Sequence, residues 1–385
     1  MISLAVPNLE GNEKKYLDNC IDTTFVSSVG QYVTEFENMV ARATESHYAV
    51  ATSSGTTGLH AALTAVGVKH GDLVIIPTFT FIASANSIAH CGAEPWLMDI
   101  DPSTWCLDGN LVRIEIEKNC ERNNEILIHK PTGKRVAALM PVYTLGNMPN
   151  MKDMRQIADE YGIPLVADAA CAIGATYIGQ NFGSLADLSV LSFNGNKTIT
   201  CGGGGAVVGD SEKLLTHVRH LTTTARVWPD YDFDEVGFNY RMTNIQAAVG
   251  VAQMERLSNF ITTKRYVRKY YEERLKRLIN RNISFFPTTE GSSCWFSGIV
   301  LPSGTKLVTA KEICTDLKQA DIEARSFWKP VHLQRPYKGC PVSKIDVAEN
   351  LWQRIITLPC STNIREEDLE YVSRKVIEAV EEVYI

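Results

Sequence analysis

The sequence predicts an α/β protein with a large domain, built on a mostly parallel seven-stranded sheet flanked by helices, and a smaller α+β domain. Three observations predict this. Short β-branched runs alternate with helical patterns from about Tyr48 to Gly209, as in parallel sheets covered on both faces. A long helical pattern then spans Thr243 to Ile279, and short strands and helices follow. The length of 385 residues suits two domains, which we place at residues 14–250 (large) and at 1–13 with 251–385 (small).

The large domain contains seven strand-like runs separated by helical stretches. The predicted strands are Tyr48–Ala51, Leu73–Pro77, Pro95–Asp99, Val136–Val142, Pro164–Ala167, Leu188–Phe193 and Ala206–Gly209. The predicted helices between them are Thr56–Val66, Ile82–His90 and Met151–Tyr161. The polar stretch from Glu117 to Arg135 is interpreted as a surface excursion. In such sheets, ligands bind beyond the carboxyl ends of the strands.

The smaller domain is predicted from shorter elements. We expect the long helical pattern to break near Ser258-Asn259. After it come two strands and two helices, predicted at Ile283–Phe286, Trp295–Val300, Ala310–Gln319 and Glu366–Val383.

Composition excludes several classes of protein. The net charge is −6 with both signs mixed along the chain, so no basic stripe predicts a nucleic-acid partner. The ten cysteines show no C-x-x-C pair, and we expect no metal site. We find neither a signal-peptide pattern nor an apolar run of the ~20 residues that span a bilayer. The sequence therefore predicts a cytoplasmic protein without a membrane partner.

The first motif is Thr52-Ser53-Ser54-Gly55-Thr56-Thr57-Gly58, between a strand and a helix. Ser54 suits the N-cap, and Gly55 allows a ligand close to the backbone. Free N–H groups at a helix start, with the helix dipole behind them, form an anion site. The alternative is a capped helix without a ligand.

The second motif is Val166-Ala167-Asp168-Ala169-Ala170. Asp168 follows an apolar strand, where a carboxylate is costly unless a cation meets it. A protonated pyridine nitrogen would be such a cation, because the carboxylate raises the pKa of that nitrogen. The alternative is a carboxylate that caps the next helix or pairs with an arginine.

The third motif is Ser192-Phe193-Asn194-Gly195-Asn196-Lys197, followed by a glycine-rich turn at residues 202–205. A lysine at a strand end in the ligand crevice is the residue type that forms an imine with an aldehyde. The alternative is an ordinary surface lysine. A fourth segment, Gly237-Phe238-Asn239-Tyr240-Arg241-Met242-Thr243, leads into a helix capped at Thr243, and alone it would be an ordinary capped loop.

In this order, the four motifs resemble the nucleotide-sugar aminotransferases of the DegT/DnrJ/EryC1/StrS family. The resemblance covers nearly the whole chain, from Pro7-Asn8-Leu9 to the run Trp328-Lys329-Pro330-Val331-His332-Leu333-Gln334. It implies the fold of the fold-type I pyridoxal-phosphate (PLP) enzymes. It also implies PLP as cofactor, with pyridoxamine phosphate as the intermediate form.

The resemblance assigns roles residue by residue. Lys197 matches the lysine that bonds to the cofactor and moves the proton, and Asp168 matches the carboxylate on the ring nitrogen. Phe81 matches the aromatic residue that stacks on the ring. Asn239 matches a phosphate ligand delivered by the neighbouring subunit, which implies a homodimer with shared active sites. The remaining cofactor contacts are expected at Ser54, Gly55, Thr56, Cys171, Ser192 and Asn194.

Two positions depart from the family pattern. Cys171 stands where many relatives carry Gln or His near the ring hydroxyl, and Gly203 stands where many carry Glu. Neither change removes the core chemistry, although Cys171 cannot make the same strong hydrogen bond. The sugar diphosphate is expected near Trp328, Lys329 and His332, with Arg241 as a further contact.

The implied reaction is transfer of an amino group, with glutamate as expected donor, to a nucleotide-linked keto sugar used in bacterial surface glycans. The run from Arg325 resembles the branch that acts on UDP-linked 4-keto-6-deoxy-2-acetamido sugars of the legionaminic acid and diacetylbacillosamine pathways. The alternatives are 3-amination, a sugar dehydratase of the same fold, an amino-acid aminotransferase and a PLP-binding regulator. Lys197 argues against the dehydratase, whose relatives carry His there, and no DNA-binding module precedes Tyr48.

Overall fold

A central sheet organises the first half of the chain. The computed structural model describes residues 1–385 except 125, 228–229 and 384–385. Within these residues, two groups of hydrogen-bonded strands are joined by the bridges Leu139–Leu165 and Val142–Asp168. Seven strands therefore lie side by side. Only β11 runs antiparallel to its neighbours, which confirms the predicted mostly parallel sheet. In spatial order the strands are β1 (Tyr48–Thr52), β11 (Gly205–Gly209), β10 (Leu188–Ser192), β7 (Val166–Asp168), β6 (Lys134–Leu139), β2 (Leu73–Pro77) and β3 (Glu94–Met98).

Both faces of the sheet are buried. Leu73 and Ile75 of β2 join one apolar core, whereas Val74 and Ile76 join another, because successive side chains of a strand point to opposite faces. This explains why β2 is apolar throughout. The first core is completed by α2 (Gln31–Thr44), α5 (Gly109–Asn119), α6 (Met151–Tyr161) and α8 (Asn244–Met254). The second is completed by α3 (Gly55–Ala65), α4 (Ile82–His90) and α7 (Glu212–Thr222).

Most predicted elements are present with small shifts of their ends, and β2, α4 and α6 have the predicted bounds. Five helices were not predicted, which are α1 (Glu13–Asp22), α2, α5, α7 and the short α11 (Val347–Leu351). The long helical pattern breaks at Glu255-Arg256, before the predicted point. The polar stretch 117–135 holds a hairpin of β4 (Cys120–Asn123) and β5 (Ile126–His129), which pairs with the start of β6. Residue 125, within this stretch, lies outside the described residues.

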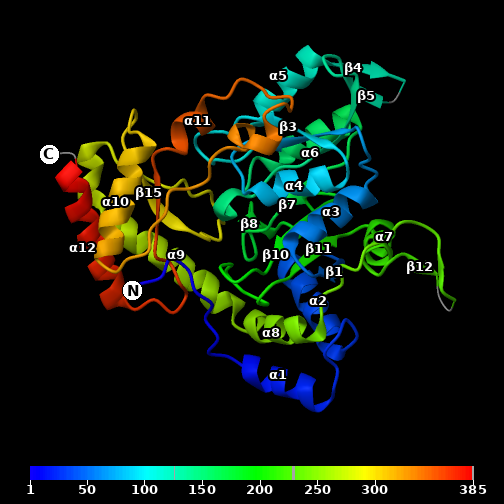
Figure 1. Ribbon diagram of the computed structural model, residues 1–385, viewed down its shortest axis with the longest axis horizontal. Helices are drawn as coiled ribbons and strands as arrows, with labels where there is room; N and C mark the ends of the chain where they lie inside the picture. Colours follow the sequence, from blue (N-terminus) through cyan, green and yellow to red (C-terminus); the bar gives the residue numbers. More distant parts are fainter. Residues whose placement is uncertain (125, 228–229, 384–385) are drawn as a thin grey trace.

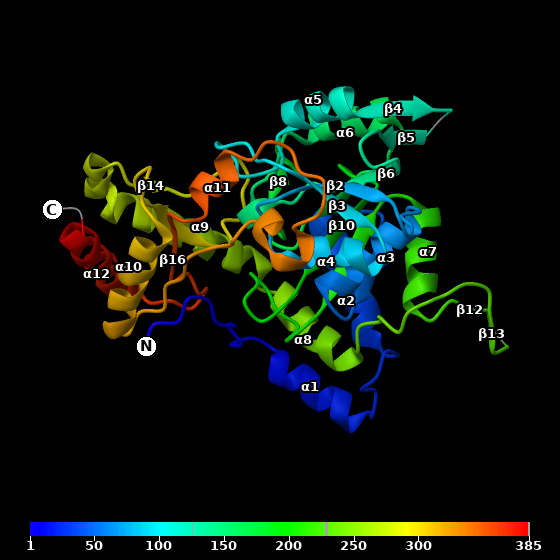
Figure 2. The same ribbon diagram turned by 45° about the horizontal axis from the view of Figure 1, so that its top comes forward.

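The C-terminal part forms a third core at one end of the molecule (Figures 1 and 2). Its antiparallel strands are β14 (Ser284–Phe285), β15 (Ser297–Val300) and β16 (Ile355–Leu358). Its helices are α9 (Leu257–Arg274), α10 (Leu307–Gln319), α11 (Val347–Leu351) and α12 (Glu366–Val383). The N-terminal segment reaches the same core, since Ile2 pairs with Ile322 and Leu4 packs among its side chains. The division into domains at residues 14 and 250 stays a prediction.

The remaining elements are short. They are β8 (Thr176–Tyr177), β9 (Gln180–Asn181), β12 (Arg226–Val227), β13 (Asp232–Phe233) and the 3₁₀ turns Thr144–Gly146, Lys276–Arg281, Val331–Leu333 and Arg335–Tyr337. The β12–β13 hairpin projects at the end of the molecule opposite to α12 (Figures 1 and 2). In the described part of the chain, every helix is too short or too polar to cross a lipid bilayer.

Candidate active site

A cavity of about 570 Å³ lies beyond the carboxyl ends of β7 and β10, against the starts of α3 and α4. This is the edge at which ligands bind in parallel sheets. Its far wall comes from the C-terminal part, through Trp295, Phe296 and residues 325–328. Ten of the predicted site residues line it: Ser54, Gly55, Thr56, Phe81, Asp168, Cys171, Ser192, Asn194, Lys197 and Trp328.

Asp168 ends β7 and is only 4% exposed. The hydroxyl of Ser84 on α4 donates to Oδ2 at 2.7 Å, and the backbone N–H of Ala170 donates to Oδ1 at 3.1 Å. Burial raises the pKa of the Asp168 carboxyl, while these two donors and the charge of Lys197 oppose the rise. The group is thus a buried acid that faces the cavity and gains from a further cationic partner.

Lys197 follows β10 on a tight turn, in which its N–H donates to the carbonyl of Asn194 at 3.0 Å. Its Nζ lies 3.2 Å from Sγ of Cys171 and 3.8 Å from the centroid of the Trp295 ring. Burial raises the pKa of the Cys171 thiol, and the lysine charge opposes this rise. The amine is therefore held on the wall of the same cavity as Asp168.

The start of α3 is closely packed against β10 and β11. Ser54 caps the helix through a reciprocal pair of hydrogen bonds with Thr57. A Cβ on Gly55 would lie 2.8 Å from Cβ of Ser192, and a Cβ on Gly205 would lie 2.5 Å from the carbonyl oxygen of Ser54. These glycines let three backbone segments meet where the first N–H groups of the helix face the cavity. A phosphate group suits that position.

Four predicted residues lie outside this cavity. Lys329 lines a smaller adjoining cavity of about 240 Å³ with Phe81 and Trp328. His332 contacts Thr78 at 2.7 Å and Glu349 at 2.9 Å, outside both cavities.

Asn239 and Arg241 belong to the loop that precedes α8. Asn239 is exposed and its backbone pairs with Thr223. The guanidinium of Arg241 lies 3.6 Å from Glu37, and burial lowers its pKa. Within a single chain, Arg241 lies beside Glu37 and outside the cavity, and its contact with the substrate stays a prediction.

Several lining residues were not predicted from the sequence, foremost Ser84 and Trp295. Ser84 lies in the first turn of α4, and an isolated serine there carries no motif. Trp295 was predicted to begin a strand of the small domain, 98 residues after Lys197, and the contact between them depends on tertiary packing.

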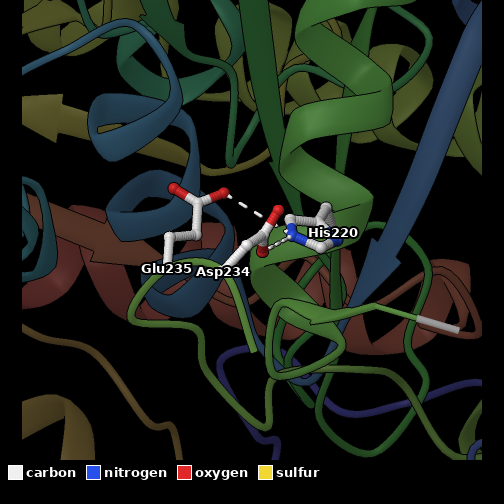
Figure 3. A group of neighbouring side chains, drawn as sticks. All are labelled: His220, Asp234 and Glu235. Atoms are coloured by element: carbon white, nitrogen blue, oxygen red, sulfur yellow. Dashed lines mark hydrogen bonds and ion pairs between the residues drawn. The ribbon is translucent and has the colours of Figure 1, made fainter. Parts of the chain in front are cut away.

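A second cluster of titratable groups lies on α7 and the loop after β13. Nε2 of His220 lies 2.6 Å from Asp234 and 3.8 Å from Glu235. Figure 3 shows both carboxylates turned toward the imidazole. His217, one turn earlier, contacts Glu235 at 2.9 Å. The His220 pair lowers the pKa of Asp234. These side chains already pair with one another and the carboxylates are exposed, so the cluster holds the loop against the helix. The prediction of no metal stays a prediction.

The donor set of the main cavity fits PLP. The buried Asp168 suits a protonated ring nitrogen, the amine of Lys197 suits an aldehyde carbon, and the start of α3 beside Ser192 suits the phosphate. Phe81 is 58% exposed at the cavity, so that its ring is accessible to a flat ligand.

Comparisons with known proteins agree with this geometry. The DegT/DnrJ/EryC1/StrS aminotransferase family profile matches residues 7–377. A GDP-perosamine synthase of Caulobacter vibrioides is 37% identical, with 100% of this chain and 98% of the relative covered. A GDP-perosamine synthase of Escherichia coli O157:H7 is 34% identical, at 97% and 96% coverage. A UDP-4-amino-4,6-dideoxy-N-acetyl-beta-L-altrosamine transaminase of Campylobacter jejuni is 26% identical, at 100% and 98% coverage.

Solved structures match over nearly the whole chain. PseC of Helicobacter pylori, an aminotransferase involved in pseudoaminic acid biosynthesis, has a TM-score of 0.88 at 20% identity, with 98% of this chain and 99% of that chain covered. DesI, crystallised with its TDP-sugar product, has a TM-score of 0.82 at 27% identity, at 96% and 90% coverage. NtdA of Bacillus subtilis, with bound pyridoxamine phosphate, has a TM-score of 0.81 at 25% identity, at 96% and 81% coverage.

Proposed function

Because this chain belongs to the DegT/DnrJ/EryC1/StrS aminotransferase family, we propose that its cavity transfers an amino group from an amino acid to carbon 4 of a nucleotide-linked 4-keto-6-deoxy sugar. Membership makes the protein a PLP-dependent sugar aminotransferase of the fold-type I group. The observation that carries the proposal is the presence of Lys197 and the buried Asp168 in one cavity beside the start of α3.

The chain's own residues divide the work. Asp168 would hold the ring nitrogen in its charged form, and the N–H groups of Gly55 and Thr56 with the Ser192 hydroxyl would hold the phosphate. The cofactor, once bound, supplies an electron sink for the carbon from which a proton leaves. Lys197 would take that proton from the α-carbon of the donor, as base, and then as acid return it two atoms along, at the cofactor's aldehyde carbon. Asn239 from a second subunit would complete the phosphate site in a homodimer.

The relatives bear on the nucleotide. Those named GDP-perosamine synthase are 37% and 34% identical, against 26% for the transaminase named for a UDP-linked sugar. This order favours a GDP-linked sugar over the UDP-linked 2-acetamido sugar expected from the sequence, which becomes the second candidate. We place the sugar diphosphate beyond Phe81 and Trp328, toward Lys329 in the adjoining cavity. The product would serve surface glycan synthesis in the cytoplasm, with glutamate as donor.

The test is a substrate panel with product masses. Purified protein is mixed with glutamate and 4-keto-6-deoxy sugars linked to GDP, UDP or TDP, with and without a 2-acetamido group. An amino sugar from the GDP-linked substrate supports the proposal. A deoxy keto sugar would establish the dehydratase alternative instead. Lys197→Ala is expected to complete no full cycle, and multiple turnovers by that variant would refute the role of the lysine.

A further inference from the structure

Trp295 belongs to the C-terminal core but reaches across to the cavity. It precedes β15, is 3% exposed, and packs against Phe296 with ring centroids 4.3 Å apart. Its ring lines the cavity wall opposite the sheet. Packing alone would account for a buried tryptophan in this position. A role beyond packing is indicated by the contacts that Trp295 makes with the segment of Lys197.

Two contacts join Trp295 to the Lys197 segment. The face of the ring meets Nζ of Lys197, with the centroid 3.8 Å away. The indole N–H donates to the carbonyl oxygen of Asn196 at 2.8 Å. One side chain thus fixes both the backbone directly before the lysine and the charged end of the lysine itself. Cys171 receives the amine at 3.2 Å, so the amine is held between a ring face and a thiol.

The backbone around Trp295 is itself anchored. Lys264 of α9, 2% exposed, donates to the carbonyl of Trp295 at 3.1 Å. Arg268, one turn later and 5% exposed, donates to the carbonyl of Phe296. The N–H of Trp295 donates to Leu145 at 3.0 Å. Lys264 and Arg268 therefore hold the backbone on which the Trp295 ring is carried. A residue that positions a catalytic group needs such a fixed backbone.

We propose that Trp295 is a positioning residue for Lys197, holding its ammonium form at the cavity wall during the proton transfer. A ring face attracts a charged amine through its quadrupole, and this attraction strengthens where water is excluded. A neutral lysine amine gains only contact from the ring. Trp295 therefore stabilises the position of Lys197 most strongly in the step in which the lysine carries the proton. This inference rests on the proposed role of Lys197 as base and acid.

The experiment compares Trp295→Phe, which keeps a ring face, with Trp295→Leu, which does not. Trp352→Leu is the matched control, because Trp352 packs against the same core away from the cavity. In the donor half-reaction, followed by cofactor absorbance, Trp295→Leu is expected to lower the rate about tenfold to thirtyfold, the loss of a desolvated cation–π contact. The donor KM should change less than threefold, and Trp295→Phe should recover most of the rate.

Two readouts separate positioning from packing. With glutamate deuterated at the α-carbon, the isotope effect should rise in Trp295→Leu, because proton transfer becomes slower relative to the other steps. In the cofactor-free protein, an amine-modifying reagent should label Lys197 faster in Trp295→Leu than in Trp295→Phe or Trp352→Leu, as measured by peptide mass spectrometry.

Equal losses in the Phe and Leu variants with an unchanged isotope effect would overturn the proposal in favour of packing. An effect confined to a raised KM for the sugar substrate would also overturn the proposal, because Trp295 would then contact the substrate and not position Lys197. Failure of the proposed function would show differently, as full cycles in Lys197→Ala.

Discussion

Replacing Asp168 by Asn is expected to leave the cofactor-free protein at least as stable as the wild type. The same change is expected to remove most of the activity of the holoenzyme. The carboxylate is 4% exposed, and among the residues that the structure describes two donate to it directly, Ser84 and Ala170, with Lys197 acting through its charge. Asn has the same shape. Its oxygen can accept from the backbone N–H, and its amide can donate to the serine hydroxyl.

The stability effect follows from the raised pKa of Asp168. A group whose pKa is higher in the folded than in the unfolded protein stabilises the fold fully below its unfolded value, and this contribution is lost as the pH rises through the folded value. The charged carboxylate therefore weighs against the fold at neutral pH. Removing the charge should change the free energy of unfolding by between zero and a gain of about 2 kcal/mol, with the gain shrinking toward acid pH.

The activity effect has the opposite sign. A neutral amide cannot compensate a cation on the ring nitrogen, and breaking a buried charge pair costs about 3–5 kcal/mol. Turnover should fall about 10²-fold to 10⁴-fold.

Asp99 provides the matched control. It is 5% exposed and lies directly after β3, but it accepts backbone N–H groups of Ile100, Asp346, Val347 and Ala348. In Asp99→Asn, two of these donors lose an acceptor, at about 1–3 kcal/mol each, so this variant should lose stability yet retain turnover per folded molecule.

The assay is chemical denaturation of the cofactor-free proteins from pH 5 to pH 8, together with kcat of the holoenzymes. The two variants should show opposite patterns. The reasoning would be refuted if Asp168→Asn lost as much stability as Asp99→Asn, or if it kept more than a tenth of the wild-type turnover.

Two further predictions test the supports of the site. Gly205→Ala should weaken PLP binding at least tenfold, measured by equilibrium dialysis, because its Cβ would lie 2.5 Å from the backbone carbonyl oxygen of Ser54, the N-cap residue of α3. Gly203→Ala should bind PLP normally, since the nearest atom to its Cβ is 3.5 Å away. Equal binding by the two variants would contradict the packing argument. Lys264→Met should lower the free energy of unfolding, measured in guanidinium chloride, by about 2–4 kcal/mol. The reason is that the carbonyls of Trp295 and Cys360 lose the ammonium donor. An unchanged denaturation midpoint would show that burying the charge of Lys264 costs as much as its hydrogen bonds contribute.

The parts of the fold that the sequence predicts are those with local signals. β2 is a continuous apolar run, and α3 and α8 begin with side-chain caps at Ser54 and Thr243. The missed α1 and α2 lack such a start, because neither Asn12 nor Gly30 makes a side-chain cap hydrogen bond, whereas α5 and α7 were missed although Asp108 and Ser211 cap them. Helices α1 and α2 are stabilised instead by contact with α8 in the same core. No local sequence pattern indicates that contact.

The same distinction separates the two sides of the cavity. Asp168, Ser192 and Lys197 could be predicted because the carboxyl ends of parallel strands meet at one edge, so that strand-end motifs far apart in sequence converge there. Trp295 and Ser84 could not, because they reach the cavity through the packing of whole helices and of the C-terminal core. Arg241 belongs to a motif, but within one chain it lies beside Glu37 of α2, so its contact with the substrate stays a prediction. A motif thus locates the chemistry that the sheet edge imposes, whereas the residues that orient this chemistry depend on contacts between distant segments, and only the folded chain identifies them.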